Sequence, residues 1–116
     1  MSAHSTHAEI RRFALSLPEA WSDTPWEDDE VVKVRKKIFA FLGGPESTTL
    51  TVKLREAHGH AMSIDGAKPA GYGLGRSGWV VVPVDADGVD ADLLRDWVEE
   101  SYRTVAPVTL VRELDA

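Results

Sequence analysis

Residues 31–54 read VVKVRKKIFAFLGGPESTTLTVKL, and apolar and other side chains alternate along most of this stretch. Three sets of apolar residues recur at every second position: Val32 and Val34, then Ile38, Ala40 and Leu42, then Leu50, Val52 and Leu54. A period of two places successive side chains on opposite faces of a strand. The stretch therefore predicts three strands, each turning one face toward a core.

Two short turns are predicted to connect these strands. Arg35-Lys36 can form a tight turn, and Gly43-Gly44-Pro45 carries residues that turns favour. Connections this short predict an antiparallel meander. Because Arg35-Lys36 contains no glycine, a single long strand through this point is the alternative.

A helix is predicted on each side of the meander. Ile10, Phe13, Ala14 and Leu17 follow the spacing of one helical stripe, which Pro18 ends. Asp90 can cap a second, longer helix. The residues on the apolar face of that helix are Leu93, Leu94, Trp97, Val98, Ser101, Tyr102 and Val105. Beyond it Pro107 breaks the helix, and Leu110, Val111 and Leu114 suggest a last short helical turn.

The segments between these elements have weaker patterns. Residues 19–30 are polar and irregular, and their Trp21 and Trp26 are expected to fold back onto the core. A short helix is predicted over 55–64 and a glycine-rich loop over 65–78. Residues 79–84 form a strand, whose proline Pro83 indicates a strand end or an edge position.

Together these elements predict an α+β fold, in which N-terminal and C-terminal helices pack on an antiparallel meander in two layers. The chain has 116 residues, which suits one domain over residues 1–116. Residues 1–7 are expected to be a disordered tail. We expect a monomer.

Composition excludes several classes of chemistry. There are no cysteines, which removes disulfides, thiolate metal sites and cysteine nucleophiles. The longest apolar runs are strand-sized, far below the ~20 residues that span a bilayer, and no signal peptide is visible. We therefore expect a cytoplasmic protein without membrane association.

The motifs that usually carry catalysis or cofactors are incomplete. Gly73, Gly75 and Gly78 match G-x-G-x-x-G, but a loop precedes them and a strand follows, the reverse of a dinucleotide site. His58 and His60 lack a third ligand nearby in the sequence. The acidic run Glu27-Asp28-Asp29-Glu30 lacks the spacing of a calcium loop. No serine lies in a nucleophile elbow. We therefore predict no catalytic residue, metal or cofactor.

Charge is distributed unevenly along the chain. Net charge is −6, but two acidic stretches, 19–30 and 85–100, flank a basic segment. A sheet face that mixes bases with aromatic rings can hold phosphates and stack bases. The predicted phosphate contacts are Lys33, Arg35, Lys36, Lys37, Lys53, Arg55, Lys68 and Arg76, and the predicted stacking residues are Tyr72 and Trp79. Phe39 and Phe41 share parity with Lys37 and would lie on this face. The alternative is that these two phenylalanines belong to the core and the lysines form a solvated rim.

The order of short motifs resembles the MmcQ/YjbR family. The matching pieces are Leu17-Pro-Glu19, Val32-Lys-Val34, Lys37-Ile-Phe-Ala40, Thr51-Val-Lys-Leu54, Pro69-Ala-Gly-Tyr72, Gly78-Trp79 and Glu99-Glu-Ser-Tyr102. The resemblance covers about residues 9–114 and implies a CyaY-like fold and a DNA-binding label. The family pattern falls on Lys37, Lys53, Tyr72, Trp79, Ser101 and Tyr102. Gly78 stands where the family often has histidine.

Three functional hypotheses follow. The first is a non-enzymatic binding module that contacts DNA or another phosphate-bearing ligand through the basic, aromatic-containing surface. The second is a protein-interaction or regulatory domain that uses the acidic stretches. The third is an enzyme whose site is assembled from distant segments.

Overall fold

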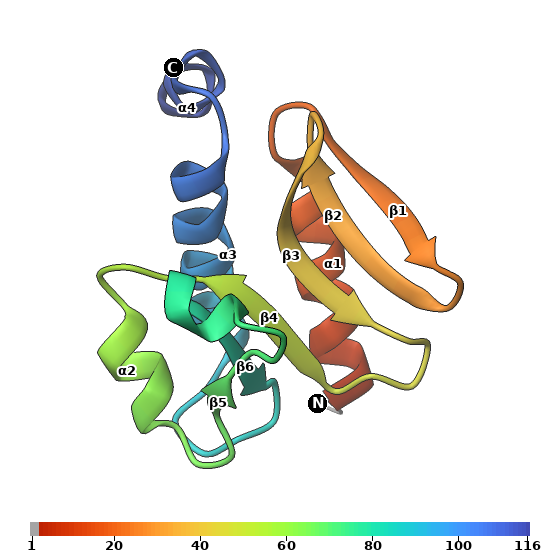
Figure 1. Ribbon diagram of the computed structural model, residues 1–116, viewed down its shortest axis with the longest axis vertical. Helices are drawn as coiled ribbons and strands as arrows, with labels where there is room; N and C mark the ends of the chain where they lie inside the picture. Colours follow the sequence, from red (N-terminus) through yellow and green to blue (C-terminus); the bar gives the residue numbers. More distant parts are fainter. Residues whose placement is uncertain (1–2) are drawn as a thin grey trace.

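The computed structural model describes residues 3–116, over which helices flank a single sheet (Figure 1). The helices are α1 (Ala3–Ser16), α2 (His58–Ser63), α3 (Ala91–Val105) and α4 (Val108–Asp115), with the 3-10 turn η1 (Leu74–Ser77). The strands are β1 (Ala20–Trp26), β2 (Asp29–Val34), β3 (Lys37–Gly43), β4 (Thr49–Lys53), β5 (Lys68–Pro69) and β6 (Trp79–Pro83).

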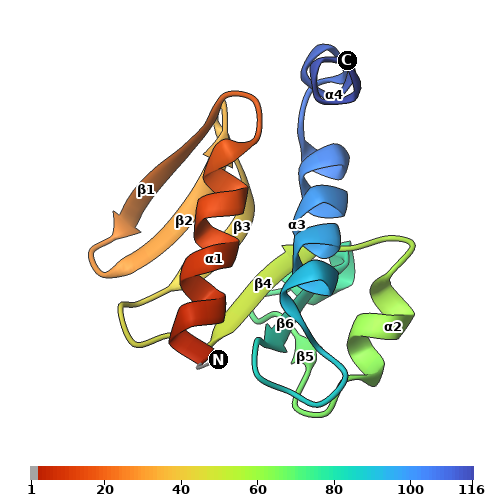
Figure 2. The ribbon, with the colours of Figure 1, turned by 180° about the vertical axis from the view of Figure 1, so that it is seen from behind.

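The strands described form one antiparallel sheet in the order β1-β2-β3-β4-β6-β5. Helices α1 and α3 cover one face, as seen from behind in Figure 2. The loop containing η1 lies over part of the other face, which no long helix covers (Figure 1). The predicted α+β architecture with a meander is thereby confirmed. None of the helices described is both long and apolar enough to cross a membrane.

The core lies between the two long helices and the sheet. It contains the predicted apolar positions of both helices and of strands β2, β4 and β6. On α3 the residues Leu94, Trp97, Val98 and Tyr102 are all buried, as their spacing predicts. The side chain of Asp90 accepts a hydrogen bond from the N–H of Leu93 at 2.8 Å, which confirms the predicted helix cap.

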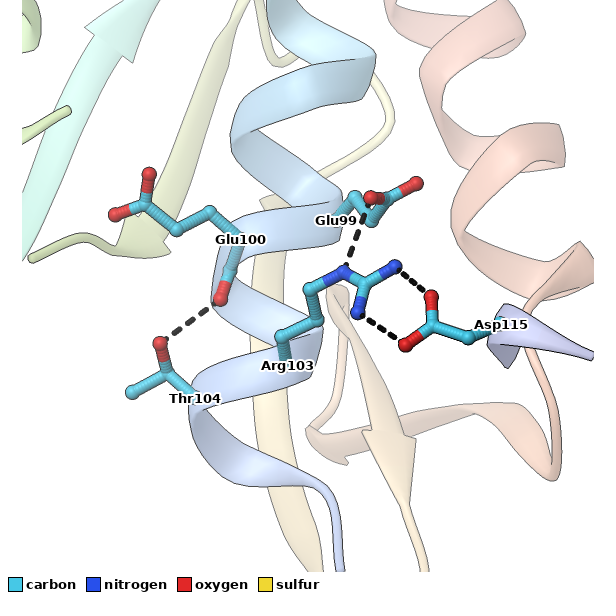
Figure 3. A network of polar contacts seen from close by, with 5 residues as sticks. All are labelled: Glu99, Glu100, Arg103, Thr104 and Asp115. Carbon is cyan, nitrogen blue, oxygen red and sulfur yellow. Dashed lines mark hydrogen bonds and ion pairs between the residues drawn. The ribbon is translucent and has the colours of Figure 1, made fainter. Parts of the chain in front are cut away.

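The last helix is tied back to α3 by ion pairs. Arg103 donates to both carboxylate oxygens of Asp115, at 3.1 and 2.5 Å, and its Nε donates to Glu99 at 3.1 Å (Figure 3). The hydrogen bonds with Asp115, then with Glu99, raise the pKa of Arg103, and the Arg103 guanidinium lowers the pKa of Asp115. Pro107 precedes α4 as its cap, so the break in the helix predicted there is confirmed.

Glu100 faces away from this ion-pair network (Figure 3). Its carboxylate accepts hydrogen bonds from the backbone N–H groups of Arg55, Glu56 and Ala57, at 2.7, 3.0 and 3.3 Å. These groups belong to the segment between β4 and α2, ahead of the first residue of the helix. Glu100 thus fixes the start of α2 to the middle of α3.

Three expectations about the N-terminal third are wrong. Residues 20–26 form strand β1, paired with β2, where an irregular segment was expected. Trp21 and Trp26 are 43% and 57% exposed, so they do not enter the core. Helix α1 begins at Ala3, so the expected tail over 1–7 is helical from that residue; residues 1 and 2 lie outside the described part.

The strict alternation predicted for residues 37–42 breaks at Phe39. Val32 lies opposite Ala40 and Lys33 opposite Ile38, so Phe39 is the extra residue of a β-bulge. The bulge turns both Phe39 and Ala40 into the core, where each is fully buried. Phe39 and Phe41 therefore do not share a face, contrary to their matching parity in the sequence.

A buried serine bridges the two strands beside this bulge. The pairing of Ala40 with Val52 would place Phe39 opposite Lys53. Instead the Ser101 hydroxyl donates to the carbonyl of Phe39 at 2.5 Å and accepts from the N–H of Lys53 at 2.9 Å. Ser101 thus satisfies two backbone groups from the helical layer, and β3 and β4 diverge beyond this point (Figure 1).

Replacing Ser101→Ala is expected to lower the free energy of unfolding by about 2–3 kcal/mol, because a buried donor and a buried acceptor lose their partner. Urea denaturation measures the change. The matched control is Ser63→Ala on α2, an exposed serine bonded only to its own helix turn, with an expected change within about 0.5 kcal/mol. Equal changes in the two variants would show that the bridge contributes nothing.

Candidate binding groove on the open sheet face

A groove of about 800 Å³ lies on the sheet face opposite the long helices. Its floor consists of side chains from the middle strands, among them Ile38, Phe41 and Thr51. β1 supplies Trp26 on one side, and the loop between β5 and η1 supplies Tyr72 on the other. The groove is mainly apolar and large enough for a small planar ligand or a short segment of chain.

Aromatic rings run through the groove in a connected series. The ring of Trp26 stacks on Phe41 with centroids 6.4 Å apart and planes 12° apart. Phe41 then meets Trp79 edge to face, with centroids 5.2 Å apart. Trp79 is only 8% exposed, so it supports the floor and is not the free stacking surface that the sequence predicted. Tyr72 is fully exposed, with its ring open to a ligand.

The loop that carries Tyr72 is held in left-handed backbone conformations. Tyr72 itself has φ 57°, Gly73 has φ 78° and Gly78 has φ 95°. A Cβ on Gly78 would lie 2.7 Å from the carbonyl oxygen of Leu54. The G-x-G-x-x-G sequence is therefore a glycine turn around η1 that leads into β6, as its context predicts, and it does not open a phosphate-binding helix.

Gly78→Ala is expected to lower the free energy of unfolding by about 2 kcal/mol, because a left-handed alanine is strained and its Cβ meets the Leu54 carbonyl. Gly59→Ala on α2 is the matched control, since its Cβ would meet nothing within 4 Å. The control should gain about 0.5–1 kcal/mol from the helix propensity of alanine. Thermal unfolding of both variants tests the pair, and equal effects would contradict this account of the loop.

Two acidic residues, Asp29 and Glu30, line the end of the groove near the β1–β2 hairpin, and their carboxylates have different partners. Glu30 accepts two hydrogen bonds from Arg11 Nε, at 2.8 and 3.0 Å, and one from the Ser22 hydroxyl. The Arg11 hydrogen bond lowers the pKa of Glu30, and Glu30 raises that of Arg11. Asp29 is exposed and has no side-chain partner within residues 3–116, so it is available to a ligand.

Because Glu30 is more acidic in the folded chain than in the unfolded chain, its contribution to stability is complete above its ordinary pKa of 4.5 and is lost as pH falls. Glu30→Gln should cost about 1 kcal/mol of unfolding free energy at neutral pH. The cost should shrink toward zero well below pH 4.5. Denaturation at both pH values measures this. Glu56→Gln, exposed near the start of α2, is the control, and a pH-independent cost for Glu30→Gln would contradict the assignment.

Two of the predicted basic residues are already paired with acids of the first strand region. Lys33 Nζ lies 2.7 Å from Asp23 and 5.1 Å from the centre of the Trp21 ring. The Lys33 ammonium, through its hydrogen bond, lowers the pKa of Asp23. Arg35, in the left-handed turn between β2 and β3, lies 3.3 Å from Glu19. These pairs neutralise the two basic residues on the β1–β2 side of the sheet.

Two other bases share a face with the groove. Lys53 lies opposite Trp79, and Lys68 lies opposite Val81, a residue of the groove wall. Directly opposed residues of antiparallel strands project from the same face. Neither lysine has an acidic partner in the part of the chain that the structure describes. Lys53 and Lys68 therefore flank the groove with free positive charge.

The remaining four bases do not gather at the groove. Lys37 lies opposite the buried Val34, so it projects on the helical side of the sheet. Lys36 is exposed in the β2–β3 turn, Arg55 in the loop after β4, and Arg76 on η1. The structure thus brings Lys53, Lys68 and Tyr72 to one face and leaves the other predicted contacts dispersed.

Sequence reasoning missed Trp26 and Asp29 as groove residues. Both lie beside the turn of the β1–β2 hairpin, which the polar sequence of residues 19–30 concealed. The sequence does contain one signal for this site: Trp26 lies three residues before Asp29, in a segment too polar to be buried, which indicates an exposed aromatic ring. His58 and His60 lie on α2, and no group of three or more metal-binding side chains occurs among residues 3–116.

A family model matches most of the chain. The YjbR family model matches residues 15–104, from the end of α1 to the end of α3. The chain belongs to the YjbR family. No curated protein matches the chain.

Two of the YjbR pattern positions have structural roles in this chain. Ser101 bridges β3 and β4, and the Tyr102 hydroxyl donates to the carbonyl of Pro18 at 2.8 Å. The Tyr102 ring is buried edge to face against Phe39, and burial raises the pKa of its phenol. The Gly-Tyr loop, Lys53 and Trp79 instead lie on the groove side. The positions on which the resemblance rests thus include residues that build the sheet and residues that shape its open face.

Proposed function

We propose that this YjbR-family chain is a non-enzymatic binding module that holds DNA, or another phosphate-bearing ligand, on the open face of its sheet. The observation that carries the proposal is the groove itself, a cavity lined by aromatic rings and flanked by the free lysines Lys53 and Lys68. Free cations bind phosphate without first breaking an internal ion pair. Exposed rings add stacking, which tolerates many base sequences.

The distribution of charge supports a local contact. The net charge of −6 opposes indiscriminate attraction to a polyanion. Several acids of the stretch 85–100 are engaged within the fold, since Asp92 pairs with Arg95, Glu99 pairs with Arg103, and Glu100 accepts hydrogen bonds from the backbone before α2. A polyanion is therefore best accommodated at the groove, where the nearby bases are unpaired.

A protein-interaction domain is the second candidate, and one observation favours it. Glu27 and Asp28 are exposed at the tip of the β1–β2 hairpin, and within the described residues their carboxylates have no partner. Such a tip suits a basic protein surface. Binding to DNA that does not depend on salt, or no binding at all, would shift the proposal to this candidate.

Fluorescence anisotropy with a labelled DNA oligonucleotide tests the DNA proposal. Affinity should fall steeply between about 50 and 200 mM salt. The double variant Lys53→Gln with Lys68→Gln should reduce the slope of log K against log salt by about 1.5, since two phosphate contacts are lost. Arg112→Gln on the exposed face of α4 is the control and should leave the slope unchanged. No binding near 50 mM salt at micromolar protein would overturn the proposal.

A further inference from the structure

One end of the groove has a free carboxylate, and an unpaired lysine lies on the same sheet face beyond the residues that line the groove. Asp29 and Thr49 line the end beside the β1–β2 hairpin, and Lys53 lies four residues further along β4. Four residues of a strand span about 14 Å. Between these ends the wall contains Phe41, Thr51 and Val81, none of which carries charge. A ligand that fits along the groove therefore places a hydrogen-bond donor at Asp29 and negative charge toward Lys53.

The middle of the groove is suited to a planar ring. Trp26 contributes a ring that is 57% exposed, and Tyr72 contributes one that is fully exposed. They come from opposite sides of the groove, one from β1 and one from the 70–78 loop. The neighbouring glycines Gly71 and Gly73 carry no side chains that would shield the Tyr72 ring. A flat ligand can thus stack on either ring while it rests on the apolar floor.

We propose that the groove binds a single unstacked nucleobase that carries an exocyclic amino group, presented by single-stranded nucleic acid. This inference rests on the proposed function and specifies its ligand. The free carboxylate of Asp29 accepts a hydrogen bond from the amino group, as carboxylates do with cytosine N4. The base stacks on Trp26 or Tyr72, and the flanking phosphates meet Lys53 and Lys68.

The acceptor chemistry of Asp29 predicts discrimination among bases. An ionised carboxylate has no hydrogen to donate. Cytosine offers an amino group at the position where thymine presents only the O4 carbonyl, which a carboxylate repels. Cytosine is therefore favoured over thymine at this position. An asparagine at position 29 carries both a donor and an acceptor, so it accommodates either base.

The same geometry favours a single strand over a duplex. In a duplex both faces of each base are covered by its neighbours, so no ring can stack on Tyr72 or Trp26 without unstacking first. That unstacking costs a few kcal/mol. A single strand presents its bases already accessible.

The test measures the affinity for three labelled DNAs by fluorescence anisotropy, at low salt and slightly alkaline pH. They are oligo(dC) and oligo(dT) of about 12 nucleotides and a hairpin whose stem has about 12 base pairs. We expect oligo(dC) to bind about tenfold more tightly than oligo(dT) and than the duplex. Asp29→Asn should bring the affinities for oligo(dC) and oligo(dT) within about twofold. Tyr72→Ala should weaken binding of both oligonucleotides about tenfold.

Asp87→Asn, at an exposed position before α3, is the matched control and should change none of these affinities. Asp29 and Tyr72 are both exposed, and circular dichroism of each variant checks that the fold is intact. Equal binding of oligo(dC) and oligo(dT), or a preference that survives Asp29→Asn, would overturn this inference. Tighter binding of the duplex would overturn it while leaving the proposed function standing. No binding to any of the three nucleic acids would overturn both.

Discussion

The Ser101 hydroxyl stands between two backbone groups that would otherwise face each other across β3 and β4. By donating to Phe39 and accepting from Lys53, it satisfies the sheet from within a helix 62 residues away from Phe39 in the chain. The bulge beside it turns Phe39 into the core and leaves Phe41 on the opposite face. The backbone beside Ser101 therefore decides that Phe39 joins the buried core and that Phe41 joins the floor of the groove.

The two faces of the sheet have different physical roles. The helical face is closed, with apolar side chains from α1 and α3 packed on β2, β3, β4 and β6. The open face has partly exposed rings and the free carboxylate of Asp29, and Lys53 and Lys68 flank it. Exposed aromatic surface lowers the stability of a small domain. Contiguous exposed apolar patches are therefore found mainly where a ligand or partner binds. This asymmetry is why the open face is the candidate site.

The structure separates two kinds of residue among those on which the YjbR resemblance rests. Ser101 holds α3 to the sheet, and Tyr102 holds α3 to the turn after α1. Tyr72 makes no such contact, since its ring is fully exposed and its own backbone is held in the left-handed region, at φ 57°. A fully exposed ring adds little to folding, whereas a ring held in a strained loop beside a groove is suited to binding.

The sequence was sufficient for features that depend on neighbouring residues. The alternation of apolar residues predicted β2 and β4, and the helical stripes predicted α1 and α3. Asp90 predicted a helix cap and Pro107 a helix break. Each of these features follows from local backbone preferences. It failed at β1, which is polar and exists through its pairing with β2, and at Phe39, whose face is set by the bulge beside Ser101. It also could not bring Trp26, Asp29 and Tyr72 to one groove. They come from separate elements, and contacts between distant segments form only when the sheet assembles.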